Sequence, residues 1–228
     1  MDRLPHLRLY RLGTAVALIA APAVFLVDNL LHPEELERGN ELQQIESIAD
    51  HYSRWQAAHA VGFVAIPLFA GAVLGLAFLV RRRQPLLGLV AGALALAGLL
   101  GLAAAITIDG YSWAIAGEAS RRPEVGARAA AAVLEDLQGS EWSLVYYLTP
   151  IGFIVGVVLL AVGLVRQGAV PVWAGGLLGL ATLMVGTETT IISNAYFIAG
   201  AAVFLLAGIA CAVPILRMGD DQFARGGA

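Results

Sequence analysis

The chain has 228 residues, of which 59% are hydrophobic and only 14% are charged, with a formal net charge of −3. A soluble domain carries about 25% charged residues, so this sequence has too few to cover an aqueous surface and predicts an integral membrane protein. Its net acidity excludes the basic footprint of a nucleic-acid-binding domain, and its single cysteine, Cys211, excludes an intrachain disulfide and a cysteine metal cluster.

Six segments are each apolar enough to form a membrane span, for which a helix needs about 20 mostly apolar residues. We expect an all-α polytopic transmembrane bundle that forms one domain over residues 1–228, with a partly helical cap outside the cytoplasm. The expected spans are residues 12–31, 59–80, 85–108, 142–165, 170–186 and 191–216.

The arginines predict how this bundle is oriented. With six spans, nine arginines and three acids fall on the side of the two termini, and five arginines and fourteen acids fall on the other. Because positively charged segments stay in the cytoplasm, we expect both termini there. The lysine-free sequence, rich in Ala, Leu, Gly and Val, is typical of a high-GC bacterium and therefore predicts a bacterial plasma membrane.

The first span has features of a signal peptide, because a basic start precedes it and Ala21-Pro22-Ala23 resembles a cleavage site. The apolar run continues past this point, so we expect the segment to be retained as a span.

Two long segments, 32–58 and 109–141, fall on the predicted outer side. The first predicts an outward extension of the second span, because apolar residues recur there at helical spacing. The second has a turn-prone stretch, 117–126, followed by an Ala-rich helix at 127–137. Long loops on one face commonly carry function or partner contacts, and the alternative is a solvated cap. The spaced apolar residues in the first segment are Leu42, Ile45, Ile48, Ala49 and Tyr52.

Glycines four residues apart recur in the spans, and such pairs let membrane helices approach closely. We favour tight packing within one bundle over a homo-oligomer interface. The pairs are Gly71/Gly75, Gly88/Gly92, Gly152/Gly156 and Gly175/Gly179.

Ionisable residues are scarce in the middle of the spans and gather at their outer ends. Charge within the hydrocarbon costs several kcal/mol, about 3 on insertion scales, and usually has a function. His51, Trp55 and His59 lie on one helical stripe, with His59 deepest. We expect a polar site where the outer ends of the spans converge, built from Asp28, His32, His59, Asp109, Glu118 and Glu188.

The candidate catalytic residues are His59, Asp28 and Asp109, with His59 as the proton acceptor and an acid orienting it. Alternatively, His32 and His59 would bind a divalent metal such as zinc, iron or copper, or His59 would ligate a haem. The expected ligand is a small apolar or amphipathic molecule, held against Trp55, Trp113, Trp142 and Tyr146.

Each of these groups also has a structural interpretation. The tryptophans and tyrosines would form an aromatic belt at the membrane boundary. His59 would form a hydrogen bond to a neighbouring helix, and His32 before Pro33 would be a loop residue. Asp109-Gly110 is a good turn signal, and Glu188 would mark the tip of a hairpin.

Three short motifs, His32-Pro33, Trp55-x3-His59 and Asp109-Gly110, together with the span layout, resemble small multi-span membrane proteins of high-GC bacteria that have no assigned activity. The resemblance implies no substrate or catalytic role. Our leading hypothesis is an outer-leaflet site that binds or transforms a small amphipathic molecule. The alternatives are a non-catalytic subunit of a larger membrane complex and a transporter of small solutes or ions.

Overall fold

The computed structural model describes residues 5–33, 41–122, 125–138, 142–187 and 193–227, and the regular structure within these ranges is entirely helical. The helices are α1 (Pro5–Leu31), α2 (Glu41–Asp50), α3 (Tyr52–Arg81), α4 (Pro85–Ser120), α5 (Gly126–Gln138), α6 (Trp142–Arg166), α7 (Val172–Gly186), α8 (Asn194–Arg217) and α9 (Asp220–Ala224).

The apolar helices identify an integral membrane protein. Within the described residues, α1, α3, α4 and α8 are each long and apolar enough to cross a membrane. Shorter apolar stretches occupy α6, from Pro150 to Arg166, and α7. The expected all-α fold is therefore found, with four helices that satisfy the length criterion for a span.

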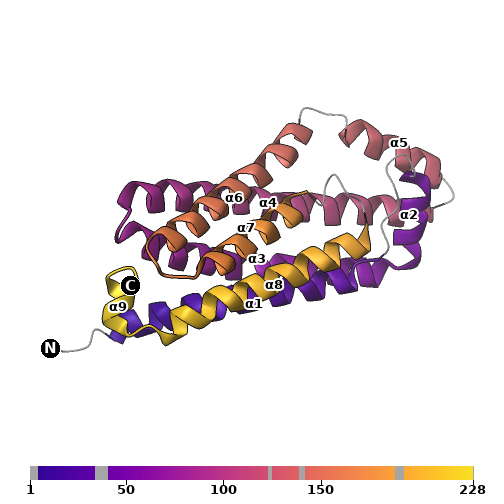
Figure 1. Cartoon of the computed structure of the whole chain (residues 1–228). Coiled ribbons are helices and arrows are strands. Elements are labelled where there is room, and N and C mark those ends of the chain that lie inside the picture. Colours follow the sequence, from indigo (N-terminus) through magenta and orange to yellow (C-terminus); the bar gives the residue numbers. More distant parts are fainter. Residues whose placement is uncertain (1–4, 34–40, 123–124, 139–141, 188–192, 228) are drawn as a thin grey trace.

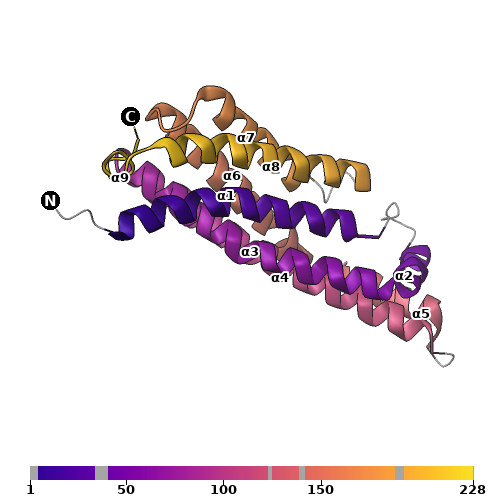
Figure 2. The same cartoon turned by 90° about the horizontal axis from the view of Figure 1, so that it is seen from below.

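The six apolar helices form a closed ring in the order α1, α3, α4, α6, α7, α8, in which each helix packs on two neighbours (Figures 1 and 2). Aromatic side chains fill its centre. The ring of Phe69 on α3 lies 6.0 Å from that of Phe153 on α6 and 5.2 Å from that of Phe204 on α8. This packing buries the inner face of each helix and leaves apolar side chains on the outside, where a membrane protein meets lipid.

Glycine allows the tightest contacts in this ring. A Cβ atom on Gly156 of α6 would overlap the backbone of Ala95 on α4, and one on Gly98 of α4 would overlap the backbone of Phe153 on α6. Of the eight glycines in the recurring pairs, seven lie against another helix of the same chain, and Gly179 faces open space. Packing within one bundle therefore accounts for most of this pattern.

Helix α4 is much longer than a membrane span. Its 36 residues extend about 54 Å, against about 30 Å for the hydrocarbon core. Its final turns pack on α2 and α5 at the end of the molecule opposite α9 (Figure 1). The small core of this cap contains Ile45 of α2, Ala116 of α4, and Ala130 and Leu134 of α5.

Of two local predictions about this end of the molecule, one is wrong and the other holds only for residues 52–58. Asp109-Gly110 forms no turn, because α4 continues as a helix to Ser120. Residues 52–58 extend the second span outward as the start of α3, but residues 41–50 form the separate helix α2, and the two helices meet at His51. The break lets α2 turn across α4, which buries Ile45 and Ile48 completely. An Ala-rich helix does occupy the expected place, as α5.

At the opposite end, α9 closes the bundle. The side chain of Phe223 is fully buried, and its ring stacks on that of Phe78 in α3 with centroids 5.6 Å apart. The guanidinium of Arg82 lies 4.8 Å from the centre of the Phe78 ring, and Arg11 forms an ion pair with Asp220 at 3.0 Å. The start of α1, the end of α3 and α9 therefore form one arginine-rich surface.

Candidate functional site

Three aromatic rings from α3 and from the residue after α1 form the centre of the candidate site. The ring of Trp55 lies 4.3 Å from that of His59 and 4.7 Å from that of His32, measured between centroids. The two histidine rings lie 5.2 Å apart. Trp55 is only 2% exposed, so it is the buried support on which both histidines pack.

His59 is held by a hydrogen bond at each ring nitrogen. Its Nδ1 lies 3.0 Å from the carbonyl oxygen of Trp55, and its Nε2 lies 3.4 Å from Oδ2 of Asp109 on α4. A carbonyl oxygen only accepts, so Nδ1 carries a proton and donates it. The contact between Nε2 and Oδ2 then requires one further proton, on the imidazole or on the carboxyl group. The geometry therefore places one shared proton between His59 and Asp109.

Gly110 makes this pairing possible. A Cβ atom at this position would lie 2.5 Å from Cδ2 of His59, so any larger residue would displace the imidazole ring. The carbonyl oxygen of Gly110 also accepts a hydrogen bond from Nε1 of Trp55 at 3.0 Å. The glycine that suggests a turn in the sequence therefore serves close packing between two helices.

Asp28 lies near this pair but does not touch it directly. Its carboxylate packs against Gly62 of α3, where a Cβ atom would lie 2.9 Å from Oδ2 of Asp28. Gly62 is three residues further along α3 than His59, or about 4.5 Å of helix. Between the two expected acids, Asp109 is therefore the one that contacts His59.

His32 lies just beyond α1, where Arg54 of α3 binds the end of that helix. Nε of Arg54 donates to the carbonyl oxygen of Leu31 at 2.6 Å, and Nδ1 of His32 donates to the carbonyl oxygen of Pro33 at 3.1 Å. Burial, together with the nearby positive charges of protonated His59 and of Arg54, lowers the pKa of His32 to about 4. His32 is therefore neutral at physiological pH.

The low pKa of His32 gives a testable pH dependence. In the unfolded chain this imidazole titrates at its ordinary pKa, so between about pH 6.5 and pH 4 the unfolded state binds the additional proton. We expect the stability contributed by neutral His32 to be retained above pH 6.5 and lost as the pH falls toward 4. Nitrogen NMR of labelled histidine, assigned with His32→Gln, would follow this ring. A His32 titration near pH 6.5 in the folded protein would contradict the packing described here.

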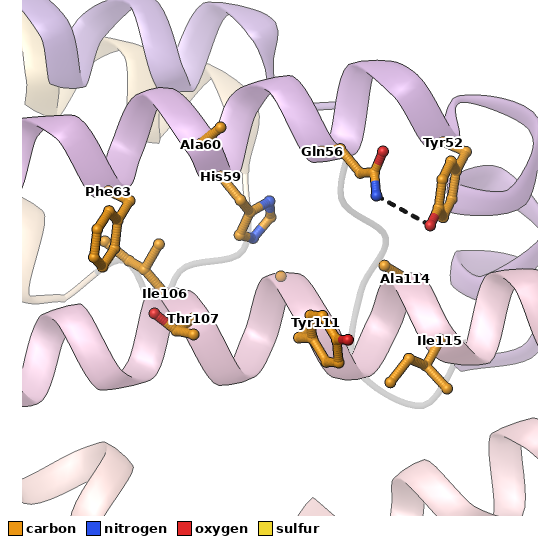
Figure 3. A pocket seen from close by; sticks show the side chains of 11 residues that line it. Tyr52, Gln56, His59, Ala60, Phe63, Ile106, Thr107, Tyr111, Ala114 and Ile115 are labelled. Carbon is orange, nitrogen blue, oxygen red and sulfur yellow. Dashed lines mark hydrogen bonds between the residues drawn. The ribbon is translucent and has the colours of Figure 1, made fainter.

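A groove between α3 and α4 exposes His59, and we call it the α3–α4 groove (Figure 3). Its volume is about 560 Å³. His59 projects from α3 toward α4, with its side chain 14% exposed, and Asp109 beside it is 31% exposed. From α3 the groove is lined by Tyr52, Gln56, His59, Ala60 and Phe63. From α4 it is lined by Ile106, Thr107, Gly110, Tyr111, Ala114 and Ile115.

The structure places the other expected site residues away from this groove or does not describe them. Trp55 packs on His59 and does not line the groove. Trp113 packs against the buried residues that α2, α4 and α5 contribute to the cap. Glu118 is exposed nine residues beyond Asp109, about 13 Å further along α4. The side chains of Trp142 and Tyr146 lie outside the described residues, as does Glu188.

The walls of the groove are residues that the sequence analysis did not select. They include Gln56 and Phe63 on α3 and Thr107 and Tyr111 on α4. Gln56 and Phe63 stand three residues before and four residues after His59, on its helix face. The sequence contains this spacing, but its tryptophans are the more conspicuous aromatic residues and indicate other walls.

A metal site would need more ligands than this arrangement supplies. Within the described ranges, no group of three or more His, Cys, Asp and Glu side chains is placed to hold a metal ion. Nε2 of His59 and the carboxylate of Asp109 would provide two ligands, and the ring of His32 is 5.2 Å away. The described contacts therefore fit a shared proton better than a divalent metal.

Comparison with known proteins gives a family but no activity. A family model described as "Domain of unknown function (DUF4386)" matches residues 10–218, nearly the whole chain. No curated protein and no solved structure matches the chain.

Proposed function

Since the chain belongs to the DUF4386 family, whose domain has no known function, we propose a function from the geometry of its own groove. The protein is a multi-pass membrane protein that binds a small amphipathic molecule in the α3–α4 groove, and His59 and Asp109 exchange a proton with the polar head of that molecule. The observation that carries this proposal is that His59 lines a largely apolar groove while its Nε2 lies 3.4 Å from Oδ2 of the adjacent Asp109.

The lengths of α3 and α4 support a position for this pair at the outer membrane boundary. We propose six spans, with the arginines at residues 81–83 on the cytoplasmic side. His59 precedes Arg81 by 22 residues and Asp109 follows Pro85 by 24 residues. These separations correspond to about 33 and 36 Å of helix, against about 30 Å for the hydrocarbon core. The pair would therefore lie where the outer leaflet meets water, in the plasma membrane of a bacterium.

The residues that flank the groove support an opening toward lipid. Phe63 is 56% exposed and Tyr111 is 70% exposed. Beside the outer leaflet, such apolar and aromatic side chains would contact acyl chains and headgroups. A lipid-like molecule would then reach His59 from within the bilayer, without crossing water.

The bonds of His59 support a role in proton exchange. Its Nδ1 is committed to the carbonyl oxygen of Trp55, so the proton between Nε2 and Asp109 is the one available to a ligand. Histidine and a carboxylate can serve as acid and base for a head group placed within hydrogen-bond distance. His59 is the proposed catalytic residue, Asp109 is its partner, and Asp28 is a second acid about one turn deeper.

Photolabelling from the bilayer would test this proposal. The full chain would be reconstituted with lipids carrying a diazirine and an alkyne, namely a fatty alcohol, a fatty acid and a phospholipid. We expect at least one probe to label peptides of α3 and α4 that contain Phe63 and Ile106. His59→Ala and His59→Gln would reduce this labelling roughly tenfold, because a hydrogen bond to a buried polar group is lost.

The matched control is His51→Ala, since His51 is exposed in the turn between α2 and α3, outside the groove. Its labelling should equal that of the unmodified protein. Labelling spread evenly over all lipid-facing helices and insensitive to His59 would contradict the proposal. If His59→Gln instead prevents assembly with another protein while labelling persists, the chain is better described as a subunit of a larger membrane complex.

A further inference from the structure

We propose that the occupant of the α3–α4 groove is an uncharged amphiphile with a hydroxyl head, whose oxygen lies between His59 and Asp109. Its chain runs toward the membrane centre past Phe63. This inference rests on the proposed function. It adds the chemical class of the ligand and the direction in which its chain runs along the groove. Three independent features of the groove support it.

The first feature is a gradient of polarity along the groove. On the side of His59 that faces the membrane centre, Phe63 and Ile106 line the groove, and the hydroxyl of Thr107 there donates to the carbonyl oxygen of Ala103 in its own helix. On the side that faces the cap, Nε2 of Gln56 donates to the hydroxyl of Tyr52 at 3.0 Å, and both side chains line the groove (Figure 3). A molecule with one apolar chain and one polar end matches this order along the helices.

The second feature is that the described lining of the groove contains no cationic side chain besides His59, whose charge Asp109 already compensates. Two nearby arginines are engaged elsewhere: Arg54 of α3 binds the end of α1, and Arg121, just after α4, binds the carbonyl oxygen of Ala49. A phosphate or carboxylate head would meet Asp109 without a compensating cation. The His59–Asp109 pair with its one shared proton has no net charge, so an uncharged head fits it best.

The third feature is the spacing between His59 and Asp109. The separation of 3.4 Å between Nε2 and Oδ2 exceeds the usual 2.9 Å or so of a hydrogen bond between nitrogen and oxygen. A rotation of the Asp109 side chain, which is 31% exposed, would admit one oxygen atom between them. A hydroxyl group both donates and accepts, so it would accept from Nε2 of protonated His59 and donate to the Asp109 carboxylate. A head that only accepts would satisfy one of these two groups.

Competition with matched single-chain molecules would test the head group. The photoreactive fatty alcohol would label the full chain in proteoliposomes, while competitors are added at equal mole fraction of the bilayer. The competitors are hexadecanol, hexadecyl methyl ether, hexadecylamine, palmitic acid and hexadecyl phosphate. We expect hexadecanol to compete about tenfold more strongly than the ether, because the ether lacks the donor to Asp109.

Variants would locate the occupant. Ala60→Trp should block labelling by filling the groove, and Asp109→Asn should abolish the preference for alcohol over ether. Ala93→Trp is the matched control, since Ala93 is exposed on α4 and does not line the groove. It should leave labelling unchanged.

The outcomes separate this inference from the proposed function. Labelling of the groove with an acid, a phosphate or an amine as the strongest competitor would overturn the hydroxyl assignment and leave the groove as a lipid site. Equal competition by alcohol and ether would overturn it as well. If no probe labels the groove, or if Ala60→Trp has no effect on labelling, the proposed function itself fails.

Discussion

Replacing Gly156 by alanine is expected to destabilise the bundle. Gly156 of α6 faces α4 so closely that a Cβ atom would overlap the backbone of Ala95. A backbone cannot rotate away as a side chain can, so the two helices would have to separate along their contact. Such overpacking costs about 1–3 kcal/mol, and in a membrane the close contact between helices is itself a main source of association. The thermal midpoint of the purified protein should fall clearly.

Gly179→Ala is the matched control for this experiment. Gly179 lies in α7, has the same repeating spacing in the sequence, and has nothing within 4 Å of its Cβ position. Because alanine favours a helix over glycine by about 1 kcal/mol, this variant should be neutral or slightly more stable. Equal loss of stability in both variants would show that the close contact of α4 with α6 does not hold the bundle together. A loss only for Gly179→Ala, with dissociation of a dimer, would favour an oligomer interface.

Replacing Gly110 by alanine is expected to disable the site while leaving the bundle folded. The added Cβ atom would lie 2.5 Å from the imidazole of His59. That ring has little freedom to move, since Trp55 packs on it and binds its Nδ1. The contact of His59 with Asp109 should therefore break, and groove labelling should fall roughly tenfold through loss of about 1.5 kcal/mol of hydrogen bonding.

Gly117→Ala on the same helix provides the control. A Cβ atom there would come no closer than 3.4 Å to α2, so the change should be tolerated and labelling should persist. Helical content by circular dichroism should be the same for both variants. If Gly110→Ala labels as well as the unmodified protein, the placement of His59 against α4 is wrong.

Much of the architecture follows from composition and apolar run length. The low fraction of charged residues, 14%, predicts a membrane protein. Each of the six apolar segments expected as spans contains a helix in the structure. The number of spans stays a prediction. Helix α7 has only 15 residues, about 22 Å, and length alone does not place it across a bilayer.

The site could be predicted as a set of residues but not as a set of contacts. Polarity near the span ends selected His32, Trp55, His59 and Asp109, and the structure brings them together. The sequence could not choose between Asp28 and Asp109 as the partner of His59, because that depends on how two helices are rotated against each other. The sequence also gives no sign that the helix containing Asp109 continues to Ser120, which places Glu118 about 13 Å further along α4.

The Asp109-Gly110 pair shows why local signals fail here. The same dipeptide that favours a turn in water is compatible with a helix in the membrane, where backbone groups must be satisfied internally. The glycine is then selected for the space that His59 occupies. Likewise, the tryptophans indicated aromatic walls, but burial directs Trp55 and Trp113 toward the cap and leaves Phe63 and Tyr111 in the groove.

Nitrogen NMR of histidine-labelled protein in nanodiscs would test the central claim most directly, with hexadecanol titrated into the bilayer. The chain has four histidines, which single His→Gln variants would assign. We expect Nδ1 of His59 to be protonated throughout and its Nε2 signal to shift as hexadecanol is added, while the signals of His6 and His51 stay fixed. An unchanged His59 signal in a folded protein, or equal shifts at all four rings, would show that the α3–α4 groove is not where the molecule binds.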